Sequence, residues 1–263
     1  MTKYLLLVTF SLASFFTHSQ DFSLFEKRTF ISSKGDSLPY RILLPEGYDK
    51  SKKYPLVLFL HGGGERGRDN EKQLTHGVKV FLDPANRKKY PCIVIAPQCM
   101  PDSQWPSAKY DRGQRPLKIE FNYNNPVTKA LAAVTELTYD VIKTESVQKT
   151  EIYVTGLSMG GMGTFEIVYR NPGLFTAAAP ICGGGDVKAY TKKQTSTKWW
   201  IFHGEVDGTI EVKHSREMYA RLQELKANVK YTEYPGIDHN SWDNAYAEPD
   251  FTAWMFEKKF KFN

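Results

Sequence analysis

The stretch from Glu151 to Gly163, EIYVTGLSMGGMG, is the strongest indication of the fold of this chain. It begins as an apolar run that is typical of a buried strand, and it ends in the first turn of a helical pattern. Between the two lies Gly156-Leu157-Ser158-Met159-Gly160, a G-x-S-x-G turn. Such a turn, placed after a strand and before a helix, holds a serine in a strained and exposed conformation. Side chains at Gly156 and Gly160 would collide with the neighbouring strand and helix. The stretch therefore predicts Ser158 as a nucleophile; the alternative is a small-residue turn with an ordinary serine.

Strands and helices alternate on both sides of this turn. Apolar runs at 56–60 and 92–96 suit strands buried on two faces, and apolar residues recur at helical spacing between 127 and 142. Alternation of this kind predicts an α/β fold with a mainly parallel sheet and helices on both faces, in a single domain. Expected strands are 22–31, 39–44, 56–60, 92–96, 151–155, 177–182, 199–202 and 229–234. Expected helices are 127–142, 158–171, 210–226 and 250–260. The segment Met100–Pro126 is the longest irregular stretch, and a loop of that length is usually functional.

The first residues have the pattern of an export signal. Lys3 precedes an uncharged apolar run from Tyr4 to Phe16, and Thr17-His18-Ser19 then supplies small residues before Gln20. This run is too short to span a membrane comfortably, and no later stretch is long and apolar enough for a transmembrane helix. We therefore expect a signal peptide over 1–19, a catalytic domain over 20–263, and a periplasmic or secreted enzyme. The alternative is a buried N-terminal strand or helix.

Charge and cysteine content argue against a nucleic-acid-binding protein and against a zinc protein. The formal net charge of the 263-residue chain is +6, but its lysines are scattered and no basic run is interleaved with aromatic residues, so we expect no nucleic-acid partner. The three cysteines, Cys92, Cys99 and Cys182, have no zinc-like spacing. A strand between Cys92 and Cys99 would hold them too far apart for a disulfide. We therefore expect structural cysteines, no metal and no cofactor, and the oligomeric state stays open.

A second glycine-rich segment supplies the other half of an acyl-transfer site. His61-Gly62-Gly63-Gly64 directly follows the predicted strand at 56–60. Acyl transfer needs two N–H groups aimed at the oxyanion, one of which comes from the residue after the nucleophile, here Met159. The other comes from the loop after the third strand, so Gly63 is the first candidate and Gly64 the second. His61 is expected to stabilise the loop rather than to carry protons.

The partners of Ser158 should follow it in the order acid, then histidine. Asp207 lies just beyond the strand at 199–202, and His239 lies just beyond the strand at 229–234. Both positions fall at the carboxyl edge of the sheet, where catalytic groups of open α/β sheets gather. Asp207 would accept a hydrogen bond from Nδ1 of His239, which leaves Nε2 to take the serine proton. Rival acids are Glu205, Asp238 and Asp186, whereas His76, His203 and His214 lack the order or position.

Five segments together resemble a known group of enzymes. They are His61–Gly67, Ala96–Cys99 with Trp105, Gly156–Gly161, His203–Asp207 and Asp238–Trp242. The chain resembles bacterial α/β-hydrolases of the predicted peptidase and phospholipase/carboxylesterase-like group, which is similar to esterase D, polyhydroxybutyrate depolymerase and carbohydrate esterase family 1. The resemblance implies the α/β-hydrolase fold and an exported esterase that acts on feruloyl, acetyl or similar esters of carbohydrates or small molecules.

Two alternatives to an esterase remain. The first is a small serine peptidase similar to prolyl oligopeptidase, although the chain has no room for the gating domain of those enzymes. The second is a binding protein that keeps the fold without catalysis, since fold does not imply function. Trp105 and Trp242 flank the expected site and could form platforms for a sugar ring or an aromatic acyl group. Alternatively, both tryptophans only pack their loops against the core.

Overall fold

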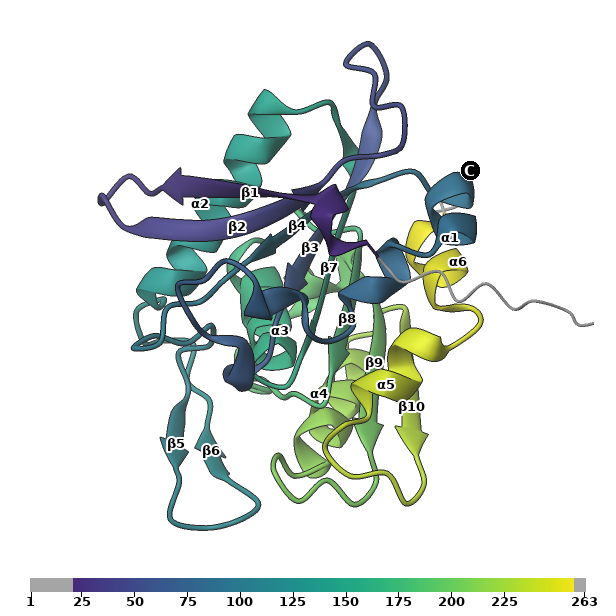
Figure 1. Cartoon of the computed structure of the whole chain (residues 1–263). Helices are drawn as coiled ribbons and strands as arrows, with labels where there is room; N and C mark the ends of the chain where they lie inside the picture. Colours follow the sequence, from purple (N-terminus) through teal and green to yellow (C-terminus); the bar gives the residue numbers. More distant parts are fainter. Residues whose placement is uncertain (1–20, 258–263) are drawn as a thin grey trace, which may run out of the picture.

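A computed structural model of the chain describes residues 21–257, and its centre is one eight-stranded sheet (Figure 1). The strand order is β1-β2-β4-β3-β7-β8-β9-β10. Pairs β1/β2 and β2/β4 are antiparallel, and every pair from β4 to β10 is parallel, as the sequence predicted. The strands are β1 (Phe25–Ile31), β2 (Ser37–Leu43), β3 (Tyr54–Leu60), β4 (Ile93–Pro97), β7 (Val147–Leu157), β8 (Ala177–Ile181), β9 (Lys198–Gly204) and β10 (Val229–Tyr234).

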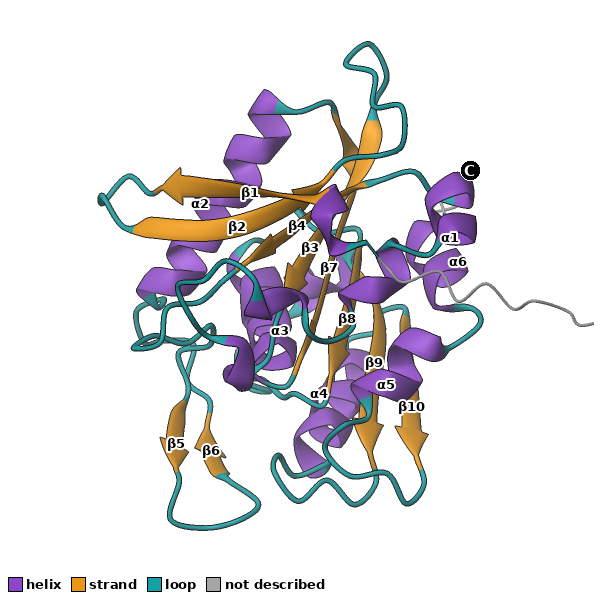
Figure 2. Ribbon diagram, viewed as in Figure 1, coloured by secondary structure: helices purple, strands orange, loops and turns teal. Residues whose placement is uncertain are grey.

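Helices cover both faces of this sheet (Figure 2). Successive side chains of a strand point to opposite faces, so Leu58 of β3 packs with one helical layer and Phe59 with the other. The first layer contains α2 (Lys129–Thr144), α3 (Met159–Arg170) and α4 (Lys213–Glu224). The second contains α5 (Trp242–Ala247) and α6 (Phe251–Phe256), with α1 (Pro84–Lys89) beside them. Short 3-10 turns are η1 (Phe22–Leu24), η2 (Gly63–Glu65), η3 (Lys72–Leu74), η4 (Val78–Phe81) and η5 (Lys192–Ser196).

The helix expected at 250–260 is present as α6, which covers Phe251–Phe256. A further helix of six residues, α5, precedes it at Trp242–Ala247, where none was expected from the sequence. Pro249 lies between them, and proline disfavours helical geometry in the residue before it. Residues 258–260 and the expected signal peptide at 1–19 lie outside the described residues.

The stretch Met100–Pro126 is not irregular throughout, because it contains a hairpin of β5 (Lys109–Asp111) and β6 (Lys118–Glu120). Strands of three residues are too short to reveal a periodic pattern in the sequence. In Figure 1 this hairpin stands apart from the main sheet, at the lower left. Its Leu117 N–H donates to the carbonyl of Thr209, 2.9 Å away, and thereby ties the hairpin to the loop after β9.

The three cysteines are buried and form no disulfide. Burial raises the pKa of the Cys92 and Cys99 thiols to about 12 and that of Cys182 well above its ordinary value. The structural role expected of them agrees with this burial. Among the described residues, no helix is long and apolar enough to cross a membrane.

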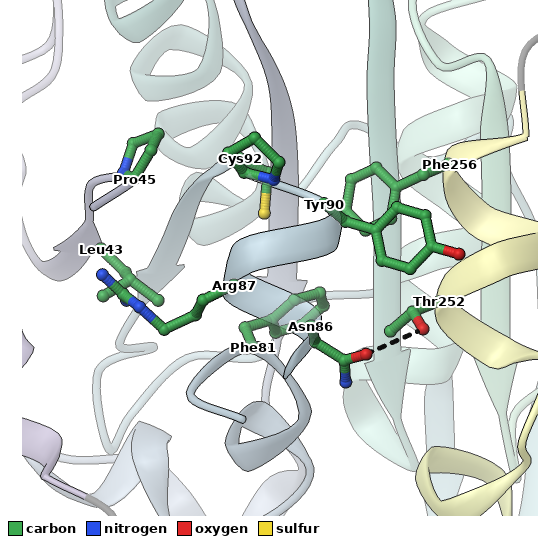
Figure 3. A pocket seen from close by; sticks show the side chains of 10 residues that line it. Leu43, Pro45, Phe81, Asn86, Arg87, Tyr90, Cys92, Thr252 and Phe256 are labelled. Atoms are coloured by element: carbon green, nitrogen blue, oxygen red, sulfur yellow. Dashed lines mark hydrogen bonds between the residues drawn. The ribbon is translucent and has the colours of Figure 1, made fainter. Parts of the chain in front are cut away.

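A small hollow lies between α1 and α6 (Figure 3). It holds about 10 Å³, room for one water molecule at most, and Asn86 and Thr252 hydrogen-bond across it at 3.2 Å. It shares no lining residue with the pocket at Ser158.

Candidate active site

Ser158 occupies the sharp turn between β7 and α3. Its backbone has φ 55° and ψ −116°, a left-handed conformation that is uncommon for any residue except glycine. The turn requires glycine at position 156, because a Cβ there would lie only 2.6 Å from the carbonyl oxygens of Leu60 and Gly160. A Cβ at Gly160 would run into the same Leu60 carbonyl. The glycines therefore allow β3, β7 and α3 to approach closely enough to strain and expose the serine.

The structure brings Ser158, His239 and Asp207 together in one hydrogen-bonded chain. His239 Nε2 lies 2.9 Å from Ser158 Oγ, and His239 Nδ1 lies 2.8 Å from Asp207 Oδ2. The two partners come from the loops after β9 and β10, which are parallel neighbours and therefore end at the same edge of the sheet. Because Nδ1 faces a carboxylate, it carries the ring proton and leaves Nε2 free to accept the serine proton.

Asp207 is fixed from several directions. Its Oδ1 accepts backbone hydrogen bonds from Thr209 at 2.8 Å and Ile210 at 2.9 Å. The buried His203 places Nε2 3.1 Å from Asp207 Oδ2. Burial alone would raise the pKa of Asp207, but the hydrogen bonds from His203 and His239 outweigh it and hold that pKa well below its ordinary value. Asp207 is therefore a carboxylate near neutral pH. The contact with His203 was missed, because no sequence signal separates this histidine from an ordinary strand residue.

The rival acids are engaged elsewhere. Glu205 accepts from the Gly236 N–H at 2.9 Å, and Asp238 accepts from the N–H groups of Gly208 and His239 at 2.7 Å. Asp186 caps a turn through the N–H groups of 188 and 189. None of these three carboxylates forms a hydrogen bond with the His239 ring in the structure described.

The loop after β3 lies beside the serine. Gly63, Gly64 and Met159 all line the same pocket as Ser158 and His239. Met159 is the first residue of α3, so its N–H has no acceptor within the helix and can serve a ligand. A Cβ at Gly63 or Gly64 would meet nothing within 4 Å, so close packing does not require glycine at either position. This placement suits an oxyanion-binding loop.

His61 stabilises this loop through hydrogen bonds of its ring. Its Nδ1 lies 2.6 Å from the Gly62 carbonyl, and its Nε2 accepts from the Cys99 N–H at 2.9 Å. Burial lowers its pKa to about 4, so the ring is neutral at physiological pH. Both nitrogens are occupied, which agrees with the structural role that the sequence suggested.

The two tryptophans have different positions. Trp105 is 0% exposed, donates from Nε1 to the His61 carbonyl at 3.0 Å, and packs edge-on against the His61 ring. Its expected contact with substrate is therefore wrong, and packing of its loop is its role. Trp242 is half-buried and meets the His239 ring edge-to-face, with centroids 5.3 Å apart. It lines a neighbouring hollow rather than the pocket at Ser158.

One set of side chains has the spacing of a metal site. Ligand atoms of Cys182, Asp207 and His239 lie within 4.8 Å of one another. Metals bind the thiolate of cysteine, whereas burial raises the pKa of Cys182 and keeps it a thiol. Asp207 and His239 are hydrogen-bonded to each other. The donor set thus fits proton transfer better than metal binding.

The pocket at Ser158 has a volume of about 250 Å³. It lies between the glycine loop, the start of α3, the loop after β9 and the β5–β6 hairpin. Its lining residues are Gly63, Gly64, Arg66, Gln104, Tyr110, Arg112, Arg115, Leu117, Ser158, Met159, Met162, Thr209, Ile210 and His239. The hairpin side of this lining was not foreseen, although Met100–Pro126 was expected to be functional.

Comparison with known proteins places this geometry in context. The model of the Esterase family, described as "Putative esterase", matches residues 31–201. The crystal structure of a thermostable esterase is similar with a TM-score of 0.81 and 38% identity, over 89% of this chain and 63% of that chain. A ferulic acid esterase structure is similar with a TM-score of 0.66 and 19% identity, over 88% of this chain and 98% of that chain. At that identity the second likeness shows the fold alone.

One relative has a name that describes it as secreted. A protein of Arthroderma benhamiae named "Uncharacterized secreted protein" is 25% identical over 233 residues, which are 77% of this chain and 23% of the relative. This chain thus spans less than two thirds of the thermostable esterase and less than a quarter of the fungal protein.

Proposed function

Since this chain belongs to the Esterase family, whose model spans residues 31–201, we propose that it is a serine hydrolase of carboxylic esters. The observation that carries the proposal is the hydrogen-bonded chain from Ser158 Oγ through His239 to Asp207, at 2.9 and 2.8 Å. Those distances are within reach for proton transfer and for orientation of the base.

Each residue then has one task in the reaction. His239 Nε2 takes the proton as Ser158 Oγ attacks the ester carbonyl, and it returns that proton to the departing alcohol. Asp207 keeps the His239 ring in the required tautomer and stabilises the imidazolium that forms. The N–H groups of Met159 and of Gly63 or Gly64 stabilise the oxyanion. Water then attacks the acyl-enzyme: His239 takes a proton from the water and returns it to Ser158 Oγ as the carboxylic acid is released. Trp242 would hold the His239 ring in place through its edge-to-face contact.

For the substrate we propose acylated carbohydrates or similar small esters, with feruloyl and acetyl groups as the first acyl groups to examine. The fold likeness to a ferulic acid esterase supports this class. We further propose that residues 1–19 direct export and that the catalytic domain starts at residue 20. The name of the fungal relative, a secreted protein, supports export.

Replacement of the nucleophile tests the reaction. Ser158→Ala should lower kcat on p-nitrophenyl acetate by about 10⁴- to 10⁶-fold, because the three residues act as a unit. The parent protein should also lose activity to a serine-directed phosphonate, with the adduct on the Ser158 peptide by mass spectrometry. Unchanged circular dichroism would show that the variant folds. Retention of more than a few per cent of the activity by Ser158→Ala would contradict the proposal.

A further inference from the structure

The pocket at Ser158 is lined by three arginines, Arg66, Arg112 and Arg115, and by no aspartate or glutamate. We propose that this pocket selects esters that carry a carboxylate close to the scissile bond. The inference rests on the proposed esterase function and narrows its substrate class.

Arg66 is held in place without being neutralised. Its Nε donates to the Gly63 carbonyl at 2.9 Å, and its Nη1 donates to the carbonyls of Ser103 at 3.2 Å and Pro101 at 3.3 Å. Carbonyl oxygens fix the direction of a guanidinium but leave its positive charge intact. The bond to Gly63 also places this charge beside the loop that would bind the oxyanion.

Arg112 and Arg115 lie in the connection between β5 and β6, and both are exposed. The Arg112 guanidinium lies 5.3 Å from the centroid of the Tyr110 ring, which itself lines the pocket. The end of this connection is bonded to the loop after β9, because the Leu117 N–H donates to the Thr209 carbonyl at 2.9 Å. The hairpin therefore brings two further cations to the mouth of the site.

These arginines differ from four of the seven others, whereas Arg41, Arg68 and Arg87 likewise form no ion pair among residues 21–257. Arg28, Arg170, Arg216 and Arg221 each form an ion pair with a glutamate. None of the three pocket arginines has a carboxylate within ion-pair distance among residues 21–257. Guanidinium groups match carboxylates through paired N–H donors, and a cleft lined by one sign of charge concentrates ligands of the other sign. The carboxylate that is missing from the pocket wall would come with the substrate.

The carboxylate could belong to either half of the ester, so two matched substrate pairs are needed. For the acyl side, mono-p-nitrophenyl glutarate is compared with neutral p-nitrophenyl pentanoate. For the alcohol side, 4-acetoxybenzoate is compared with its neutral methyl ester. We expect kcat/KM to favour the anionic member of one pair by about 10- to 100-fold, as charge-assisted hydrogen bonds would give. The pair that shows this preference identifies the side, and added NaCl should weaken it.

Variants then assign the preference to the pocket. The double variant Arg112→Gln/Arg115→Gln, and separately Arg66→Gln, should lower the ratio of anionic to neutral kcat/KM by about tenfold or more. Arg68→Gln is the matched control: Arg68 belongs to the same loop as Arg66 and is exposed, but it does not line this pocket. Its ratio should stay at the parent value. Arg112 and Arg115 are exposed, so their double variant should fold even if Arg66→Gln does not.

Two results would overturn the inference. The first is equal kcat/KM for the anionic and neutral members of both pairs in the parent protein. The second is an equal loss of the ratio in Arg68→Gln, because the preference would then reflect overall charge rather than the pocket. Either result leaves the esterase function intact, since the neutral esters are still hydrolysed. If the parent protein hydrolyses none of the four esters and Ser158 does not react with the phosphonate, both the esterase function and this inference are wrong.

Discussion

At the scale of single residues, the candidate site depends on how each polar group is held. Ser158 is strained, His239 is oriented from one side by Asp207 and from another by Trp242, and Asp207 accepts four hydrogen bonds or close contacts. A base that is fixed in this way needs no rearrangement as charge develops, which is the condition for large electrostatic stabilisation. His203 contributes to the same end by holding Asp207 ionised.

Substitution of the acid separates Asp207 from its nearest rival in sequence. Asp207→Asn should lower kcat by about 10⁴-fold, because an amide favours the wrong tautomer of the histidine. Glu205→Gln should lower kcat by less than about threefold, since its carboxylate contacts only the Gly236 N–H among the hydrogen bonds found. Steady-state kinetics on p-nitrophenyl acetate measures both effects. If Glu205→Gln is the more damaging change, the assignment of the acid is wrong.

At the scale of elements, the turn between β7 and α3 depends on close backbone contact. Gly160→Ala should lower the free energy of unfolding by about 2–3 kcal/mol, because the new Cβ would meet the Leu60 backbone, which cannot rotate away. The loss should appear in urea unfolding followed by circular dichroism. Gly64→Ala is a suitable control for stability, since a Cβ there meets nothing within 4 Å. Equal stability of the two variants would show that the contact can relax.

The β5–β6 hairpin illustrates a different kind of element. Of its strand residues only Ile119 is buried, yet the hairpin supplies one wall of the pocket and two of its three arginines. Its backbone bond to Thr209 connects that wall to the residues that hold Asp207. Under the proposed function, variation of the hairpin would change substrate selection while the sheet and the proposed triad stay as they are.

At the scale of the whole molecule, buried histidines couple stability to pH. Burial lowers the pKa of both His61 and His214 from 6.5 to about 4. Between those values the unfolded chain binds protons that the folded chain does not, so stability falls as pH drops from about 6.5 to about 4. Each histidine contributes a slope of about 1.4 kcal/mol per pH unit in that window.

His214→Gln tests this coupling without touching the proposed triad. The variant should lose less stability than the parent between pH 6.5 and pH 4, by roughly 1–3 kcal/mol in all, as urea unfolding at both pH values would measure. If the free energy of unfolding changes equally with pH in the parent and in His214→Gln, His214 does not contribute to the pH dependence, and this prediction is wrong.

The features of this protein that could be predicted from its amino-acid sequence are those that depend on local patterns and chain order. Apolar runs gave the strands of the main sheet, the G-x-S-x-G turn gave Ser158, and the rule that parallel strands end at one edge led to Asp207 and His239. Each of these rests on neighbours in the chain or on a fixed order of elements, so no distance had to be known.

Which side chains line the pocket at Ser158 depends on long-range packing, which the sequence does not reveal. Trp105 looked like a platform in the sequence, but packing of its loop against His61 buries it completely. His203 and Asp207 meet only because the strand end and the following turn bring the two together. Arg66 and Arg115 are far apart in the sequence, yet they line one pocket, and the connection that carries Arg115 is bonded to Thr209 through Leu117. Burial and long-range contact are sums over the whole packed chain, and no local pattern of residues contains them.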